Sequence, residues 1–176
     1  MIYMALDTNV LLHYKLFTEI DWPTVADSSD VTLLIALTVI HELDARKYIG
    51  SDERLKNRAQ MVLRQIEAAE SMGWATPCIH LALAPRVSVA QLQELQLDPE
   101  SADDRILGEL LAFQSAHDGD IRFVTADYGA RVKAKGHGLT CIALAPELAS
   151  MTPTLASKKF ASFANALPGM KLHDQC

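Results

Sequence analysis

The sequence predicts a Rossmann-like α/β fold, a three-layer α/β/α sandwich around a central, mainly parallel sheet of about five strands. Short, nearly continuous apolar runs, typical of strands buried on both faces, alternate with segments whose apolar residues recur at helical spacing. Strands that alternate with helices need crossover connections, and these produce a parallel sheet with helices on both faces. The 176 residues suit one domain.

The predicted strands are apolar runs rich in residues that favour extended backbone. Around Val87 the run RVSV is a weaker fifth candidate. The four stronger candidates are, in order, Ile2–Leu6, Val31–Leu37, Ile121–Thr125 and Leu139–Leu144.

Three helices are predicted between these strands. The longest has Ser51 before it and Gly73 behind it as start and stop signals. A short helix from Tyr128 to Lys135 is expected to end at Gly136. The apolar positions of the longest helix are Leu55, Ala59, Val62, Leu63, Ile66 and Ala69, and those of the remaining helix are Ile106, Leu107, Leu110 and Leu111.

The segment after Pro146 differs from the rest of the chain, so we expect a domain over residues 1–146 and a C-terminal tail over 147–176. The tail carries one short amphipathic helical pattern that Pro168 and Gly169 would end. We expect it to pack on the domain or on a partner. The apolar stripe consists of Leu155, Phe160, Phe163, Ala164 and Leu167.

Composition excludes several classes of protein. A formal net charge of −6 argues against a protein that holds nucleic acid by a general basic field. The three cysteines, Cys78, Cys141 and Cys176, are far apart and favour neither a disulfide framework nor a thiolate zinc site. With neither a signal-peptide pattern nor a membrane-spanning apolar run, the sequence predicts a soluble, cytoplasmic protein.

Acidic residues follow or adjoin several predicted strands. Asp7 directly follows the first strand, and Glu42 is expected in the first turn of a helix entered from the second. Asp103 and Asp104 begin the Ile106 helix, and Asp127 lies two residues beyond another strand. Ligands of open parallel sheets collect beyond the carboxyl ends of the strands, so these acids are expected to meet at one edge.

Each acid alone also has a capping interpretation. Asp7 and Asp127 could be helix N-caps, and Ser101 to Asp104 resembles the start of a capping box. Glu42 could simply favour a helix N-terminus. Caps need not converge, however, and clustered carboxylates repel one another without a counter-ion. A cation explains the set better, and an all-oxygen set favours Mg²⁺ or Mn²⁺, which can support attack of water on a phosphodiester.

The ordered segments DTNVLL, ELDARK, DDRIL and VTADYGARVKAKGHGL resemble those of a PIN domain, over about Ile2 to Leu144. The ELDARK and DDRIL forms are most similar to the PIN domains found beside PhoH-type ATPases. The resemblance implies an Mg²⁺- or Mn²⁺-dependent endoribonuclease, and many bacterial relatives are toxins of toxin-antitoxin pairs. It therefore also implies an RNA substrate, an antitoxin partner and a homodimer.

The resemblance also implies roles for individual residues. Asp104 is preferred over Asp103 because the acid of the family directly precedes the x-I-L of its helix, while Asp103 would help to bind a second metal or a water. Thr8, Asn9 and Thr125 match polar residues that orient the acids or their water. The implied catalytic, metal-binding tetrad is Asp7, Glu42, Asp104 and Asp127.

Local positive charge would offset the acidic total and bind RNA phosphates. One candidate group starts at Arg46 and Lys47, and the other is the run that contains Arg131 and Lys133, with Arg105 between them in sequence. Such charge runs are more often simply the solvated face of a helix.

Other classes of protein are also open from the sequence. A haloacid-dehalogenase-type phosphatase needs an acid where Asn9 stands, and a phospho-acceptor receiver needs paired acids near the first strand, so both fit poorly. The stronger alternative is a catalytically weak PIN-like module that binds RNA or protein as a scaffold.

Overall fold

A computed structural model gives the fold of residues 1–48, 52–72, 74–76 and 79–149. Its sheet has the order β3-β4-β2-β1-β5-β6, and every neighbouring pair is parallel except β3 and β4. The predicted Rossmann-like α/β fold with a mainly parallel sheet is confirmed. The strands are β1 (Ile2–Leu6), β2 (Val31–Ala36), β3 (Trp74–Thr76), β4 (Ile79–Ala84), β5 (Asp120–Val124) and β6 (Thr140–Ile142).

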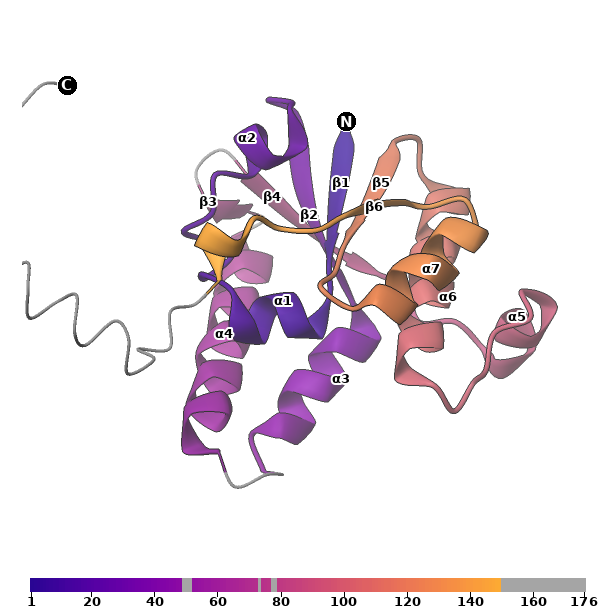
Figure 1. The fold of residues 1–176 in the computed structure, drawn as a ribbon, viewed down its shortest axis with the longest axis horizontal. Helices are drawn as coiled ribbons and strands as arrows, with labels where there is room; N and C mark the ends of the chain where they lie inside the picture. Colours follow the sequence, from indigo (N-terminus) through magenta and orange to yellow (C-terminus); the bar gives the residue numbers. More distant parts are fainter. Residues whose placement is uncertain (49–51, 73, 77–78, 150–176) are drawn as a thin grey trace, which may run out of the picture.

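Helices follow most of the strands, as the alternating pattern predicts. In Figure 1, β1, β2 and β5 lie side by side, and α1 and α3 begin at the ends of β1 and β2. The helices are α1 (Thr8–His13), α2 (Trp22–Ala26), α3 (Leu37–Arg46), α4 (Glu53–Met72), α5 (Val89–Glu94), α6 (Ala102–Ala116) and α7 (Tyr128–Gly136), followed by the 3₁₀ turn η1 (Pro146–Leu148).

Strand β1 lies at the point where the strand order reverses. The chain runs outward from β1 to β2 and β4, and then returns across the sheet to β5 and β6. Right-handed crossovers therefore put the helices of the first half and those of the second half on opposite faces. Such a reversal point is where open α/β sheets bind their ligands, beyond the carboxyl ends of the strands.

The core explains why the strands read as continuous apolar runs. All six residues of β2 are buried, and four of the five residues of β1 are buried. A strand covered on both faces must be apolar at consecutive positions, because both sides of the pleat meet helices. Met4, Leu33 and Val39 are fully buried in one continuous cluster.

The weaker strand prediction at RVSV is wrong. The fifth parallel strand is β4, Ile79–Ala84, and Ser88 instead caps α5. The Ser88 side chain accepts from the Gln91 backbone N–H, and the Gln91 side chain accepts from the Ser88 N–H, which makes a capping box. The valines of RVSV thus flank a helix start.

The beginnings of two helices also differ from expectation. Helix α3 begins at Leu37, so Glu42 lies in its second turn and not in the first turn as predicted. At the start of α4, the Asp52 carboxylate accepts from the backbone N–H groups of Arg54 and Leu55. The predicted signals Ser51 and Gly73 lie outside the described residues.

The beginning of the predicted tail contacts the domain. The Lys15 N–H donates to the Leu148 carbonyl at 2.7 Å, and Tyr14 forms an antiparallel bridge with Ala149. The predicted tail helix lies within 150–176, outside the described residues, so that helix and the boundary at 146 stay predictions.

The composition predicted neither a membrane-spanning segment nor a disulfide framework, and two structural findings bear on these points. Within residues 1–149, as far as they are described, no helix is long and apolar enough to cross a membrane. Cys141, the cysteine that the structure describes, is a free thiol.

Gly108 lets α5 pack closely against α6. A Cβ atom at this position would lie 2.3 Å from Leu92 Cδ2, and Leu92 is only 3% exposed. We expect Gly108→Ala to destabilise the protein by about 1 kcal/mol, because overpacking costs roughly 1–3 kcal/mol and helix propensity returns up to about 1 kcal/mol. Urea unfolding measures the change, with Gly136→Ala as control, since its Cβ would meet nothing within 4 Å. Equal midpoints for both variants would contradict the close contact.

Candidate functional site

Asp7 occupies a capping position without capping. It is the N-cap residue of α1, but its side chain makes no capping hydrogen bond. Its Oδ2 instead accepts from the Thr125 hydroxyl, at the end of β5, at 2.6 Å, and Asp7 is 4% exposed. The carboxylate is therefore held between two parallel strands, and the capping interpretation does not explain it.

Thr125 connects Asp7 to Asp127. The fully buried Thr125 hydroxyl donates to Asp7 and accepts from the Asp127 backbone N–H at 3.0 Å. The Asp127 side chain caps α7, since its Oδ1 accepts from the Ala130 N–H at 2.9 Å. Asp127 is exposed, and capping uses only Oδ1, one of the two oxygens of its carboxylate.

Thr8 links the end of β1 to α3. Its hydroxyl donates to Glu42 Oε2, and Thr8 is buried while Glu42 is half-buried. Asn9, one residue further along α1, has an exposed side chain. The two polar residues after Asp7 therefore differ in role: Thr8 positions Glu42, whereas the side chain of Asn9 is exposed.

A buried acid that the sequence analysis did not single out fixes the beginning of α3. Ala36, the N-cap residue, has no side chain able to cap. Glu109 of α6 takes this role, accepting from the Thr38 backbone N–H and from the Thr38 hydroxyl, both at 2.9 Å. At 2% exposure, Glu109 locks α3 and therefore the Glu42 that α3 carries. Its position among the apolar residues of α6 was the available sequence signal.

Asp104 is held by two strong interactions. Its Oδ1 accepts from Lys133 Nζ at 2.5 Å, and its Oδ2 accepts from the Asp98 N–H at 2.9 Å. Burial acts to raise the pKa of Asp104, but the hydrogen bonds from Lys133 and Asp98 outweigh it, so the pKa lies below its ordinary value. Ser101 caps α6 through the Asp104 N–H, as the capping interpretation predicts.

Asp103 faces a different environment from its neighbour. It is exposed, and its charge acts on Asp7. Burial raises the pKa of Asp7 above its ordinary value, the Thr125 hydrogen bond lowers it, and the charges of Asp103 and Glu42 raise it again. Both carboxylates that act on Asp7 are negative, so this edge of the sheet gathers unfavourable negative charge.

The carboxylates fit a hard cation by their chemistry. In the described part of the chain, no three histidine, cysteine or acidic side chains are already arranged around one metal position. Asp7, Glu42 and Asp103 nevertheless supply oxygen donors whose charges interact, and a carboxylate keeps lone pairs beyond one hydrogen bond. Mg²⁺ commonly takes one or two carboxylates and completes its coordination with waters and substrate oxygens.

The predicted substrate-binding cations lie in different settings. Arg46 is exposed, whereas Lys47 forms an ion pair with Asp44 at 2.6 Å. Lys133 is engaged by Asp104, and Arg131 lies over the Tyr128 ring at 6.0 Å. Arg105 is exposed at the start of α6, where its Nε donates to the Pro99 carbonyl.

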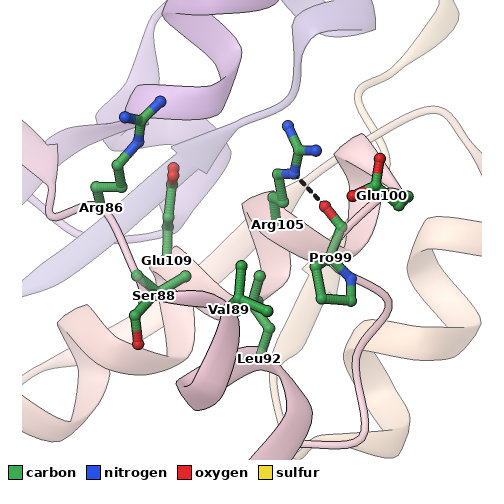
Figure 2. A pocket seen from close by; sticks show the side chains of 9 residues that line it. Arg86, Ser88, Val89, Leu92, Pro99, Glu100, Arg105 and Glu109 are labelled. Atoms are coloured by element: carbon green, nitrogen blue, oxygen red, sulfur yellow. Dashed lines mark hydrogen bonds between the residues drawn. The ribbon is translucent and has the colours of Figure 1, made fainter.

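A pocket of about 320 Å³ lies between the segment after β4, α5 and α6. Figure 2 shows Arg86 and Arg105 on either side of Glu109, with all three side chains pointing the same way. The residues that line it are Arg86, Val87, Ser88, Val89, Leu92, Pro99, Glu100, Arg105 and Glu109.

Fold and site together define an α/β domain with buried and partly buried acids at the reversal point of a parallel sheet. Residues 4–145 match the sequence profile of the PIN domain, which covers most of the chain. The chain belongs to the PIN domain family, whose members are generally nucleases.

A solved structure supports the same fold. The chain is similar to a domain of a functionally unknown protein from Methanocaldococcus jannaschii DSM 2661, with 17% sequence identity and a TM-score of 0.52. The similarity covers 87% of this chain and 98% of that domain. The comparison with curated proteins gave no match.

Proposed function

We propose that the protein is an Mg²⁺- or Mn²⁺-dependent endoribonuclease. The observation that carries this proposal is the Asp7 carboxylate, which is buried, does not cap its helix, and lies within the field of Asp103 and Glu42. A fold needs no such cluster for stability, because like charges near a desolvated acid oppose folding. Membership of a family of nucleases supports hydrolysis of a phosphodiester.

Asp7, Glu42 and Asp103 would hold the cation, with Asp127 at the same edge. When bound, a divalent cation supplies neutralisation of phosphate charge and an activated water. Thr125 orients Asp7, and Thr8 orients Glu42, so both carboxylates are fixed before substrate arrives. Glu109 keeps α3, and with it Glu42, in place through Thr38.

Asp103 takes the place in this proposal that the PIN resemblance implied for Asp104. Asp104 is engaged by Lys133 and Asp98, whereas Asp103 is exposed and interacts with Asp7. We expect Asp103→Asn to lower cleavage by at least about a hundredfold without lowering the free energy of unfolding of the metal-free protein. Asp104→Asn should destabilise the fold by about 1–3 kcal/mol and reduce cleavage less. Urea unfolding and cleavage rates measure the two effects. If folded Asp104→Asn lost cleavage and Asp103→Asn did not, Asp104 and not Asp103 would belong to the metal site.

The direct test of the proposed function uses labelled single-stranded RNA with Mn²⁺, Mg²⁺ or EDTA. Cleavage is expected with the metals and is expected to stop in EDTA. Cleavage that continues in EDTA would overturn the metal mechanism. Tight RNA binding without cleavage under any metal would instead support the scaffold alternative.

Two partner predictions come from the resemblance alone. An antitoxin protein and a homodimer both stay predictions. Light scattering of the purified chain measures the oligomeric state, and co-purification with the product of a neighbouring gene tests for an antitoxin.

A further inference from the structure

The pocket between α5, α6 and the segment after β4 combines two arginines with an apolar wall. Arg86 lies at one side and Arg105 at the other, and Val87, Val89 and Leu92 supply apolar lining. A volume of about 320 Å³ lies at the small end of the range for ligand pockets.

The acid at the centre of this pocket is already compensated. Both Glu109 oxygens accept hydrogen bonds from Thr38, at the N-terminal end of α3, where the helix dipole favours negative charge. Glu100, the other acid of the lining, is exposed at the side beyond Pro99. The charge of Arg86 also acts on Glu109, and both guanidinium groups keep further N–H donors for an anion.

Both guanidinium groups are partly oriented. Arg105 Nε donates to the Pro99 carbonyl, and Arg86 Nη2 lies 3.4 Å from His41 Nδ1. An arginine keeps several N–H donors after one such contact, and its fork matches a phosphate. Orientation before binding reduces the entropy lost when the phosphate arrives.

The pocket adjoins the proposed cleavage site. Thr38, which donates to the pocket residue Glu109, lies four residues before Glu42 on α3, so Thr38 and Glu42 share a face of that helix. The Thr38 to Glu109 hydrogen bonds join α3 to α6. A strand bound at the acids would therefore reach the pocket with a neighbouring nucleotide.

We propose that this pocket binds one nucleotide of a single-stranded RNA beside the cleaved bond. Arg86 and Arg105 bind its phosphate, and the base lies against Val87 and the exposed Val89. Single-stranded RNA presents unstacked bases that apolar and guanidinium surfaces can contact. This subsite rests on the proposed ribonuclease function and adds to it a nucleotide-binding position away from the acids.

The test measures RNA binding apart from cleavage. A fluorescent single-stranded RNA is titrated by polarisation in Mg²⁺ against protein that carries Asp7→Asn. Arg86→Gln and Arg105→Gln are each expected to weaken binding about tenfold and to reduce the salt slope by about 0.7 per lost phosphate contact. Arg64→Gln, an exposed charge on α4, is the matched control and should change neither value. Affinities equal to that control would overturn the proposal.

Competition tests the base contact. A nucleoside monophosphate should displace the RNA at lower concentration than inorganic phosphate does, and Val89→Ser should reduce that difference. Equal competition by phosphate alone would overturn the nucleotide assignment. Thermal unfolding of each variant verifies that the compared proteins are folded.

The outcome separates the two proposals. Mn²⁺-dependent cleavage by the unaltered protein, with arginine variants that bind RNA like the control, would overturn the subsite alone. Absence of cleavage by the unaltered protein, with weakened binding in both arginine variants, would overturn the nuclease and leave an RNA-binding pocket.

Discussion

We expect Asp7→Asn to lose RNA cleavage by at least about a hundredfold while the metal-free protein becomes more stable. The asparagine can still accept the Thr125 hydrogen bond, but it removes a buried charge that Asp103 and Glu42 oppose. Stabilisation of about 1 kcal/mol corresponds to a rise in Tm of roughly 2–4 °C. Thermal unfolding in EDTA and cleavage in Mn²⁺ measure the two effects.

Manganese should reverse this order of stability. A ligand that binds only the folded state raises its stability, so Mn²⁺ should raise the Tm of the unaltered protein and not that of Asp7→Asn. Asp118→Asn, an exposed acid between α6 and β5, serves as control and should retain both cleavage and the response to Mn²⁺. An Asp7→Asn variant that is less stable than the unaltered protein in EDTA would show that the carboxylate serves the fold.

The largest loss of stability is expected for Glu109→Ala. The change leaves the buried Thr38 N–H and hydroxyl without their acceptors and opens a cavity between α3 and α6. We expect a loss of about 2–4 kcal/mol in the free energy of unfolding, measured in urea. Since α3 carries Glu42, cleavage by the folded fraction should also fall. A loss below 1 kcal/mol would contradict this role.

Glu109→Gln separates hydrogen bonding from charge. The amide can accept from the Thr38 N–H and donate to its hydroxyl, so most of the stability should remain. Burial raises the pKa of Glu109 above its ordinary value of 4.5, while hydrogen bonds from Thr38 act to lower it.

This pKa shift has a defined sign. Between 4.5 and the raised pKa, the folded state binds more protons than the unfolded state, so the contribution of Glu109 to stability falls as pH rises. Glu109→Gln does not titrate and should therefore gain stability relative to the unaltered protein across this window. Urea unfolding at several pH values measures the difference, and a difference that shrinks with rising pH would contradict the assignment.

The buried strands were predictable from sequence because burial on both faces leaves an unbroken apolar run, as in β2. The strand β4 was missed because it is less uniform, with an exposed His80 near its start and half-buried residues along its middle. The segment RVSV was wrongly predicted as a strand because its valines favour extended backbone. That propensity does not detect the capping box that Ser88 and Gln91 form at the start of α5.

In the candidate site, the end of the first strand was enough to predict that Asp7 lies at the edge of the sheet. An acid that directly follows a buried parallel strand must lie at the carboxyl edge. The choice between Asp103 and Asp104 depends on the rotation of α6, because consecutive helical residues point about 100° apart. Glu109 contacts Thr38 and lines a pocket with Arg86, and all three residues are far apart in the sequence. No local sequence pattern could therefore predict that they lie together.

The hydrogen bond between Thr125 and Asp7 joins residues 118 positions apart. During synthesis β1 can pair with β2 early, but its other edge lacks a partner until β5 has been made. The nascent chain therefore has no oriented Asp7 while most of its length is still emerging from the ribosome. Late completion of the sheet therefore delays the orientation of Asp7 until β5 has been made and has paired with β1.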